Sequence, residues 1–261
     1  MLPMCRKIPK FLTSLQSTIP KHLSTSPLEA PSNFQQDFEK HHCPTNFLQR
    51  SVLTVGAAAI SILDPHRGDM IACLGETTGE GALHYMKSCM EQSKEGLQIL
   101  QEQPRINTNT VNLNYLQNLP PNTLGYMYYK FLEVNQVTPD SRMSVQFIDN
   151  PELAYVMQRY REIHDLIHTA LQMPTNMLGE VTVKWVEALQ FKLPMCISGA
   201  IFGPLRLKTK HRQLYLDRYL PWAIKTGGSA EFLLNIYFEK RWEQKLSEFY
   251  KEINLEPLIL K

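Results

Sequence analysis

The chain has 261 residues, and its 43% apolar and 20% charged content is that of a globular protein, not of a disordered or fibrous one. Its five cysteines are odd in number, widely spaced and never arranged as Cys-x-x-Cys, which argues against a disulfide framework and against a thiolate zinc site. Residues 1–30 carry four basic and one acidic side chain, so without them the formal net charge falls from +2 to −1, which argues against a general nucleic-acid-binding protein.

The segment 1–30 has the composition of a mitochondrial transit peptide. It is basic and rich in serine and threonine, and no acidic residue precedes Glu29. Apolar residues between Ile8 and Ile19 recur at spacings of three or four, so a basic amphipathic helix can form there. A disordered tail of the same composition is the alternative. We expect the segment to direct the chain to the mitochondrion.

The first expected helix covers residues 47–62 and is rich in alanine. Its apolar stretch 52–63 is about 12 residues long, whereas a helix that spans a bilayer needs roughly 18 to 20 apolar residues. We therefore expect a buried helix or one that lies at a membrane interface, in a protein that is soluble or membrane-associated.

The rest of the chain also favours helices. Asn150-Pro151-Glu152 supplies an N-cap, a proline at the first helical position and an acid near the positive helix end. Gly227-Gly228 is expected to separate the last two helices, and 144–148 is expected to be an extended loop. Further helices are expected at 80–100, 113–119, 126–135, 151–172, 176–193, 211–225 and 229–253. With about eight helices and no linker, the prediction is a single all-α domain over 46–255 with a helix-turn-helix metal site.

The chemistry concentrates in two of these helices. His164 and His168 are four residues apart, so their imidazoles lie on one helix face, one turn apart, and can share a metal ion. Asp165 lies beside them and can either bind the metal or act on a metal-bound group. Glu180 follows the break at Met173-Pro174, in the first turn of the next helix, where a hairpin can fold it back. We expect Zn²⁺ or another divalent cation at His164, Asp165, His168 and Glu180.

Other interpretations of these signals remain open. A bare His-x-x-x-His pair is more often an ordinary hydrogen-bonded pair than a metal site. A zinc hydrolase would use a glutamate base where this chain has the shorter Asp165. The glycine-rich segment 75–81 lacks the Lys-Ser/Thr of a phosphate-binding loop, so we expect a turn there. The basic run 206–212 is either a solvated loop or a surface attracted to anionic lipid headgroups.

The histidine helix resembles a known family, the fourth Coq protein family of ubiquinone (coenzyme Q) biosynthesis. The sequence His164-Asp165-Leu166-Ile167-His168, followed eleven residues later by Glu180, is similar to the His-Asp-x-x-His-x11-Glu signature of that family. The similarity covers about residues 46–255 and shows no departure at the four ligand positions. Further segments that resemble the family are 74–79, 154–162, 174–180 and 220–223.

The resemblance implies a peripheral protein on the matrix side of the inner mitochondrial membrane, in a complex with other ubiquinone-biosynthesis enzymes. It implies a zinc site and a carbon-carbon lyase, either a simple or an oxidative carboxy-lyase. The implied substrate is a 4-hydroxy-3-methoxy-5-polyprenylbenzoate, which loses its C1 carboxylate. Our mechanistic hypothesis is that Asp165 or water delivers a proton to the ring carbon that bears this carboxylate. A non-catalytic lipid-binding scaffold that organises the complex is the alternative.

Overall fold

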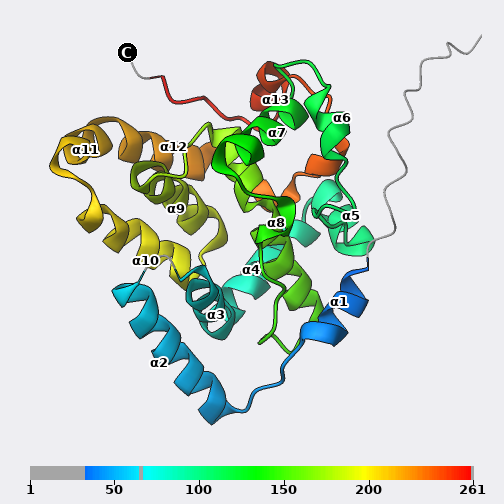
Figure 1. Ribbon diagram of the computed structural model, residues 1–261, viewed down its shortest axis with the longest axis vertical. Coiled ribbons are helices and arrows are strands. Elements are labelled where there is room, and N and C mark those ends of the chain that lie inside the picture. The colour runs from blue at the N-terminus through cyan, green and yellow to red at the C-terminus, as the bar shows by residue number, and fades with distance from the viewer. Residues whose placement is uncertain (1–32, 65–66, 260–261) are drawn as a thin grey trace, which may run out of the picture.

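The computed structural model describes residues 33–64 and 67–259 and is all-α, as expected (Figure 1). The expected transit peptide lies outside the described residues. The described part contains no strand, and none of its helices is long and apolar enough to cross a membrane. The helices are α1 Phe34–His41, α2 Phe47–Leu63, α3 Gly68–Thr78, α4 Glu80–Glu91, α5 Lys94–Glu102, α6 Leu113–Gln117, α7 Leu124–Asn135, α8 Pro151–Leu171, α9 Met177–Phe191, α10 Pro194–Phe202, α11 Thr209–Leu214, α12 Leu220–Ser229 and α13 Leu246–Glu252.

Helix α8 is the centre of the molecule. Every residue from Leu153 to Leu171 is buried, because α1, α4, α5, α7 and α9 all pack against it. In Figure 1 it runs through the middle of the molecule, with α7 at one end and α4 beside it. A helix that is covered on all sides must satisfy every polar side chain it carries within the protein.

Three charged residues of α8 meet that requirement with ion pairs to three different segments. The guanidinium of Arg159 is fully buried and donates to both carboxylate oxygens of Glu239. Arg161 pairs with Glu76 of α3 at 2.6 Å. Glu162 accepts hydrogen bonds from the side chain of Arg105 at 2.7 Å and from the backbone N–H of Ile106 at 2.8 Å. The pairs fasten α8 to both the N-terminal and the C-terminal parts of the described chain. Because these pairs are buried, removing one partner would leave an unpaired buried charge and destabilise the fold.

Two layers flank this centre. Helix α9 packs against α10 and α12, and α2 packs along α3 at the lower left edge of Figure 1. Short 3₁₀ and π segments complete the fold. They are η1 Pro139–Ser141, η2 Gly203–Arg206, the π-helical η3 Tyr215–Tyr219, η4 Leu233–Asn235 and η5 Phe238–Lys240.

Some local predictions were wrong. Gly227 and Gly228 lie within α12 and do not separate two helices. The helix expected at 229–253 is reduced to η4, η5 and α13, because side chains satisfy the backbone of this segment. For example, the Gln190 side chain bonds the carbonyls of Ala230 and Glu231 and the N–H of Leu233. The turn expected at 75–81 is instead the end of α3, the cap Gly79 and the start of α4.

Candidate metal centre

Local sequence signals set the positions of α8 and α9. Asn150 caps α8 by accepting hydrogen bonds from two backbone N–H groups, and Asn176 caps α9 by accepting one from Gly179 at 3.0 Å. Helix α8 ends at Gln172, whose positive φ of 53° produces a left-handed turn. The chain then reverses and brings the first turn of α9 back alongside α8, as the sequence predicted.

Gly179 permits this close approach. A Cβ atom at this position would lie 1.9 Å from the carbonyl oxygen of Pro174, closer than any two such atoms can be. The next residue is Glu180, so the absence of a side chain at Gly179 determines how near the Glu180 carboxylate comes to α8.

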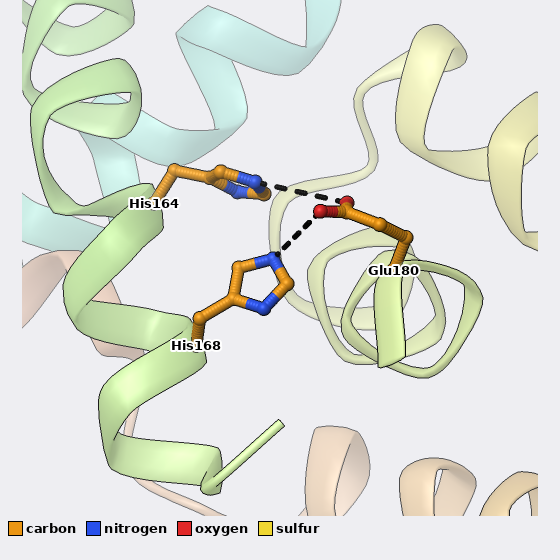
Figure 2. A group of neighbouring side chains, drawn as sticks. All are labelled: His164, His168 and Glu180. Carbon is orange, nitrogen blue, oxygen red and sulfur yellow. Dashed lines mark ion pairs between the residues drawn. The ribbon is translucent and has the colours of Figure 1, made fainter. Parts of the chain in front are cut away.

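Two imidazoles and one carboxylate converge between the helices (Figure 2). The Nε2 atom of His164 lies 4.0 Å from Glu180 Oε2, and the Nε2 atom of His168 lies 3.4 Å from Glu180 Oε1. One ligand atom from each of the three residues lies within 4.8 Å of the others. Among the described residues, His164, His168 and Glu180 form a group that could hold a metal cation.

The orientation of His164 is set by a buried carboxylate. Its Nδ1 atom lies 2.6 Å from Glu187 Oε1, and since a carboxylate only accepts, Nδ1 is the protonated nitrogen. Burial lowers the pKa of His164 below 6.5, against the opposing effect of Glu187. The ring is therefore neutral at neutral pH, and its Nε2 lone pair faces Glu180.

Glu187 is itself held by several donors. Its second oxygen, Oε2, accepts from Lys184 and from the Tyr160 hydroxyl, the latter at 3.1 Å, and lies 3.5 Å from the sulfur of Cys196. Burial raises the pKa of Glu187, but the charge of Lys184 and the hydrogen bonds from His164 and Lys184 outweigh this effect and hold the pKa well below the usual range. Glu187 is therefore a fixed anion behind His164. A carboxylate in this position is the usual partner of a metal-binding histidine.

His168 is oriented by the turn that ends α8. Its Nδ1 atom donates to the carbonyl oxygen of Met173 at 3.1 Å, which directs its Nε2 toward Glu180. This Nε2 is buried and makes no hydrogen bond. A buried imidazole nitrogen without a partner is rare in proteins. Here it points toward Glu180, next to the free Nε2 of His164.

The three groups together fit a divalent cation. Two imidazole nitrogens and a carboxylate oxygen that face one another are held together by a cation or a proton between them. Burial raises the pKa of Glu180, but the neighbouring imidazoles of His168 and His164 outweigh this effect and lower the pKa to about 2. Two histidines and one glutamate are also the protein ligands of catalytic zinc sites that keep a position open for water or substrate.

Asp165 is not part of this group. Its carboxylate is buried and forms an ion pair with Arg142, in the loop before α8. The structure thus brings together three of the four residues expected as ligands and turns the fourth toward a cation of the protein itself.

Two residues of the site had no role in the sequence predictions. Glu187 lies seven residues after Glu180, two turns along the same face of α9, and that spacing is a signal that could have identified it. Arg142 lies in an irregular loop and belongs to no pattern in the sequence.

The chain is similar to proteins of one known family. The family model described as "Coenzyme Q (ubiquinone) biosynthesis protein Coq4" matches residues 39–258. A protein of Bombyx mori named "Ubiquinone biosynthesis protein COQ4 homolog, mitochondrial" is 53% identical over 256 residues, or 98% of either chain. An Aedes aegypti protein of the same name is 54% identical over 231 residues, which cover 88% of this chain and 84% of that one.

The fold is also found in a solved structure. The crystal structure of a Nostoc punctiforme protein, provisionally assigned to ubiquinone biosynthesis, matches with a TM-score of 0.61 at 16% identity. The match covers 80% of this chain and 97% of that one, and at this identity it shows a shared fold. From the family match and the close relatives, the chain belongs to the Coq4 family of ubiquinone biosynthesis proteins.

Proposed function

We propose that this protein removes the C1 carboxylate of a 4-hydroxy-3-methoxy-5-polyprenylbenzoate intermediate in ubiquinone biosynthesis. We place it in the mitochondrion, at the matrix face of the inner membrane, in a complex with other enzymes of the pathway. Family membership supports the pathway, and the names of the relatives support the mitochondrion. The observation that carries the chemical proposal is the convergence of two imidazole Nε2 atoms and the Glu180 carboxylate on one point.

In this proposal His164, His168 and Glu180 hold the cation, and Glu187 fixes the orientation of His164. When bound, a divalent cation supplies Lewis acidity toward a carboxylate or phenolate oxygen of the substrate. Arg142 offers a second positive group for the anionic substrate. Burial lowers its pKa, but Asp165 and the charge of Glu180 outweigh that effect and raise it, so the guanidinium stays charged.

The bond changes of the reaction balance without a redox partner. A proton adds to the ring carbon that bears the carboxylate, the bond from that carbon to the carboxylate breaks, and its electron pair restores the aromatic ring as CO₂ leaves. The proton comes from water, either directly or through Asp165 after that carboxylate has taken a proton from water. Asp165 lies next to His164 in the sequence and is buried against Arg142, so an anion that pairs with Arg142 would also lie close to this acid.

Carboxyl-labelled prenylated 4-hydroxy-3-methoxybenzoate offers a direct test. Purified protein loaded with Zn²⁺ should release labelled CO₂, and chelator treatment or Glu180→Gln should abolish the release. Equal release with and without chelator would remove the metal from the mechanism. If metal-loaded protein binds the prenylated substrate but releases no CO₂, the catalytic proposal fails and the scaffold remains.

The scaffold alternative also has an observation in its favour. Helix α2 and the segment from α10 to α11 expose many large apolar side chains, which a catalytic site between α8 and α9 does not require. A protein that holds lipid for other enzymes would need such a surface.

A further inference from the structure

The outer face of α2 is apolar where a surface helix would normally be charged. The exposed residues of this helix include no ionised side chain, and its one charged residue, Arg50, turns inward to the carbonyls of Glu76 and Thr77. At 100° per residue, the large exposed apolar positions fall on the side of the helix opposite the buried Ala57, except Phe47 at the start of the helix. These exposed side chains are Phe47, Leu48, Val52, Val55, Ile62 and Leu63, which are 65–88% exposed.

A second apolar surface follows from α10 to η3. Helix α10 contains no charged residue, and its large exposed side chains include Ile201 at 52% and Phe202 at 62% exposure; Leu205 of η2 is 72% exposed. Residues 194–216 contain four arginines and lysines and no acidic residue. The side chains of Lys208 and Lys210 are exposed and form no ion pair with any described residue. The surface is therefore apolar and carries an excess of positive charge.

The two surfaces adjoin. Arg206 of η2 donates a hydrogen bond to the carbonyl oxygen of Ile62 at 2.7 Å, which ties the end of α2 to the basic segment. Helix α3 packs against both α2 and α10. In Figure 1, α2, α10 and α11 lie along the left side, whereas α5 and α13 lie at the upper right. We call the outer sides of α2, α10, η2 and α11 the apolar–basic face.

We propose that the apolar–basic face docks on a lipid bilayer that contains anionic headgroups. Apolar side chains would enter the boundary between headgroups and acyl chains, and the lysines would lie at the level of the phosphates. The positive charge of the face favours a bilayer over a second copy of the chain as its partner. A two-fold symmetric dimer through this face would bring identical basic segments together, whereas anionic headgroups neutralise them.

The face also lies near the metal centre. The backbone of Gly203 in η2 lies against Val181, so close that a Cβ at Gly203 would be 2.7 Å from the Val181 side chain. Val181 directly follows Glu180, the cluster residue with the most exposed side chain, at 35%. The head group of a substrate that is anchored in the bilayer by its polyprenyl chain would thus lie near the Glu180 carboxylate. This part of the inference rests on the proposed function, and it names the surface through which a membrane-anchored substrate would reach the metal centre.

Flotation of the full-length protein with vesicles tests this inference without any substrate, so its result is independent of CO₂ release. Vesicles of phosphatidylcholine are compared with vesicles that also contain anionic phosphatidylglycerol, at low and high salt. The basic variant is Lys208→Gln/Lys210→Gln and the apolar variant is Leu48→Gln/Val55→Gln, whose two wild-type side chains are each 71% exposed. The control, Lys94→Gln/Lys251→Gln, changes two exposed lysines on α5 and α13. Residues 1–32 are common to all variants, so differences among them report on the face.

The basic variant should bind anionic vesicles roughly 30-fold more weakly than wild type at low salt, and the difference should vanish at high salt. The apolar variant should bind roughly tenfold more weakly at both salt concentrations. The control should bind like wild type. Unchanged binding of both face variants would overturn the inference. A dimer in light scattering that the apolar variant dissociates would also overturn it, in favour of a second copy as the occupant. Circular dichroism confirms that each variant is folded.

Discussion

At the scale of single residues, Asp165 and Glu180 are both acidic and both close in sequence to the histidines, but their side chains face different partners. Glu180 faces two imidazole nitrogens, and Asp165 faces Arg142. A carboxylate that faces two imidazole nitrogens can share a cation with them, whereas a carboxylate paired with an arginine already has a positive partner. The number of protein ligands can therefore be tested by changing each acid to its amide.

Glu180→Gln should lose most of the bound metal, because the substitution removes the one anionic ligand of the group. Asp165→Asn should retain about one equivalent, because its carboxylate is paired with Arg142 and not with the histidines. Metal content is measured by mass spectrometry of the purified proteins. Loss of the metal from Asp165→Asn would show that Asp165 binds the cation as a fourth ligand.

Glu187→Gln should weaken Zn²⁺ binding by roughly 10- to 100-fold, because an amide holds the His164 ring less firmly and no longer donates charge to it. Affinity is measured by competition with a chromophoric chelator. Glu256→Gln, which changes an exposed acid paired with Lys225, serves as the control and should bind zinc normally. Equal affinities of the two variants would mean that Glu187 has only a structural role.

At the scale of elements, the turn between α8 and α9 and the ion pairs of α8 determine where the site residues lie. Gly179→Ala should weaken zinc binding at least roughly tenfold, because the added methyl group collides with Pro174 and displaces the first turn of α9. Gly228→Ala, also within a helix but with no atom within 4 Å of the added Cβ, should be neutral or stabilise the fold by about 0.5–1 kcal/mol. Chelator competition and urea unfolding of both variants check this pair of expectations.

Arg159→Met should lower the free energy of unfolding by about 3–5 kcal/mol, because it leaves the buried carboxylate of Glu239 without its partner. Arg67→Gln, which breaks a solvent-exposed pair with Asp69, should leave the free energy of unfolding nearly unchanged. Urea denaturation followed by circular dichroism gives both values. A small effect at Arg159 would mean that water reaches Glu239.

The helices that could be predicted from the sequence are those whose ends are set by their own residues. Asn150 and Asn176 cap α8 and α9 locally, so these helices were predicted correctly, and the structure brings together three of the four residues expected as ligands. The segment after α12 could not be predicted, because its backbone groups bond to Gln190 on another helix. The direction of Asp165 depends on Arg142, which is distant in sequence.

At the scale of the whole molecule, the charges of the metal centre make stability depend on pH. The pKa values of Glu180 and Glu187 lie below 4.5 and that of His164 lies below 6.5. In each case the unfolded chain binds the proton more readily than the folded protein. The free energy of unfolding must therefore fall as the pH decreases through these windows.

The melting temperature of chelator-treated protein should accordingly decline on acidification from pH 6.5, where His164 contributes first, and continue to fall below pH 4.5 as the two glutamates contribute. Glu187→Gln should show a shallower decline below pH 4.5. Scanning calorimetry at a series of pH values measures both curves. A melting temperature that is constant between pH 6.5 and 4.5 would contradict the neutral, buried state of His164.

Helix α8 carries both histidines and is also the helix that three buried ion pairs bind to the rest of the chain. The position of the imidazoles therefore depends on how Glu76, Arg105 and Glu239 hold this helix. A substitution at any of these three residues should weaken the proposed zinc binding, although each lies outside the group of His164, His168 and Glu180. Substitutions that lower ubiquinone production should thus be sought along the whole length of this helix and among its ion-pair partners, and not only among the residues proposed to hold the cation.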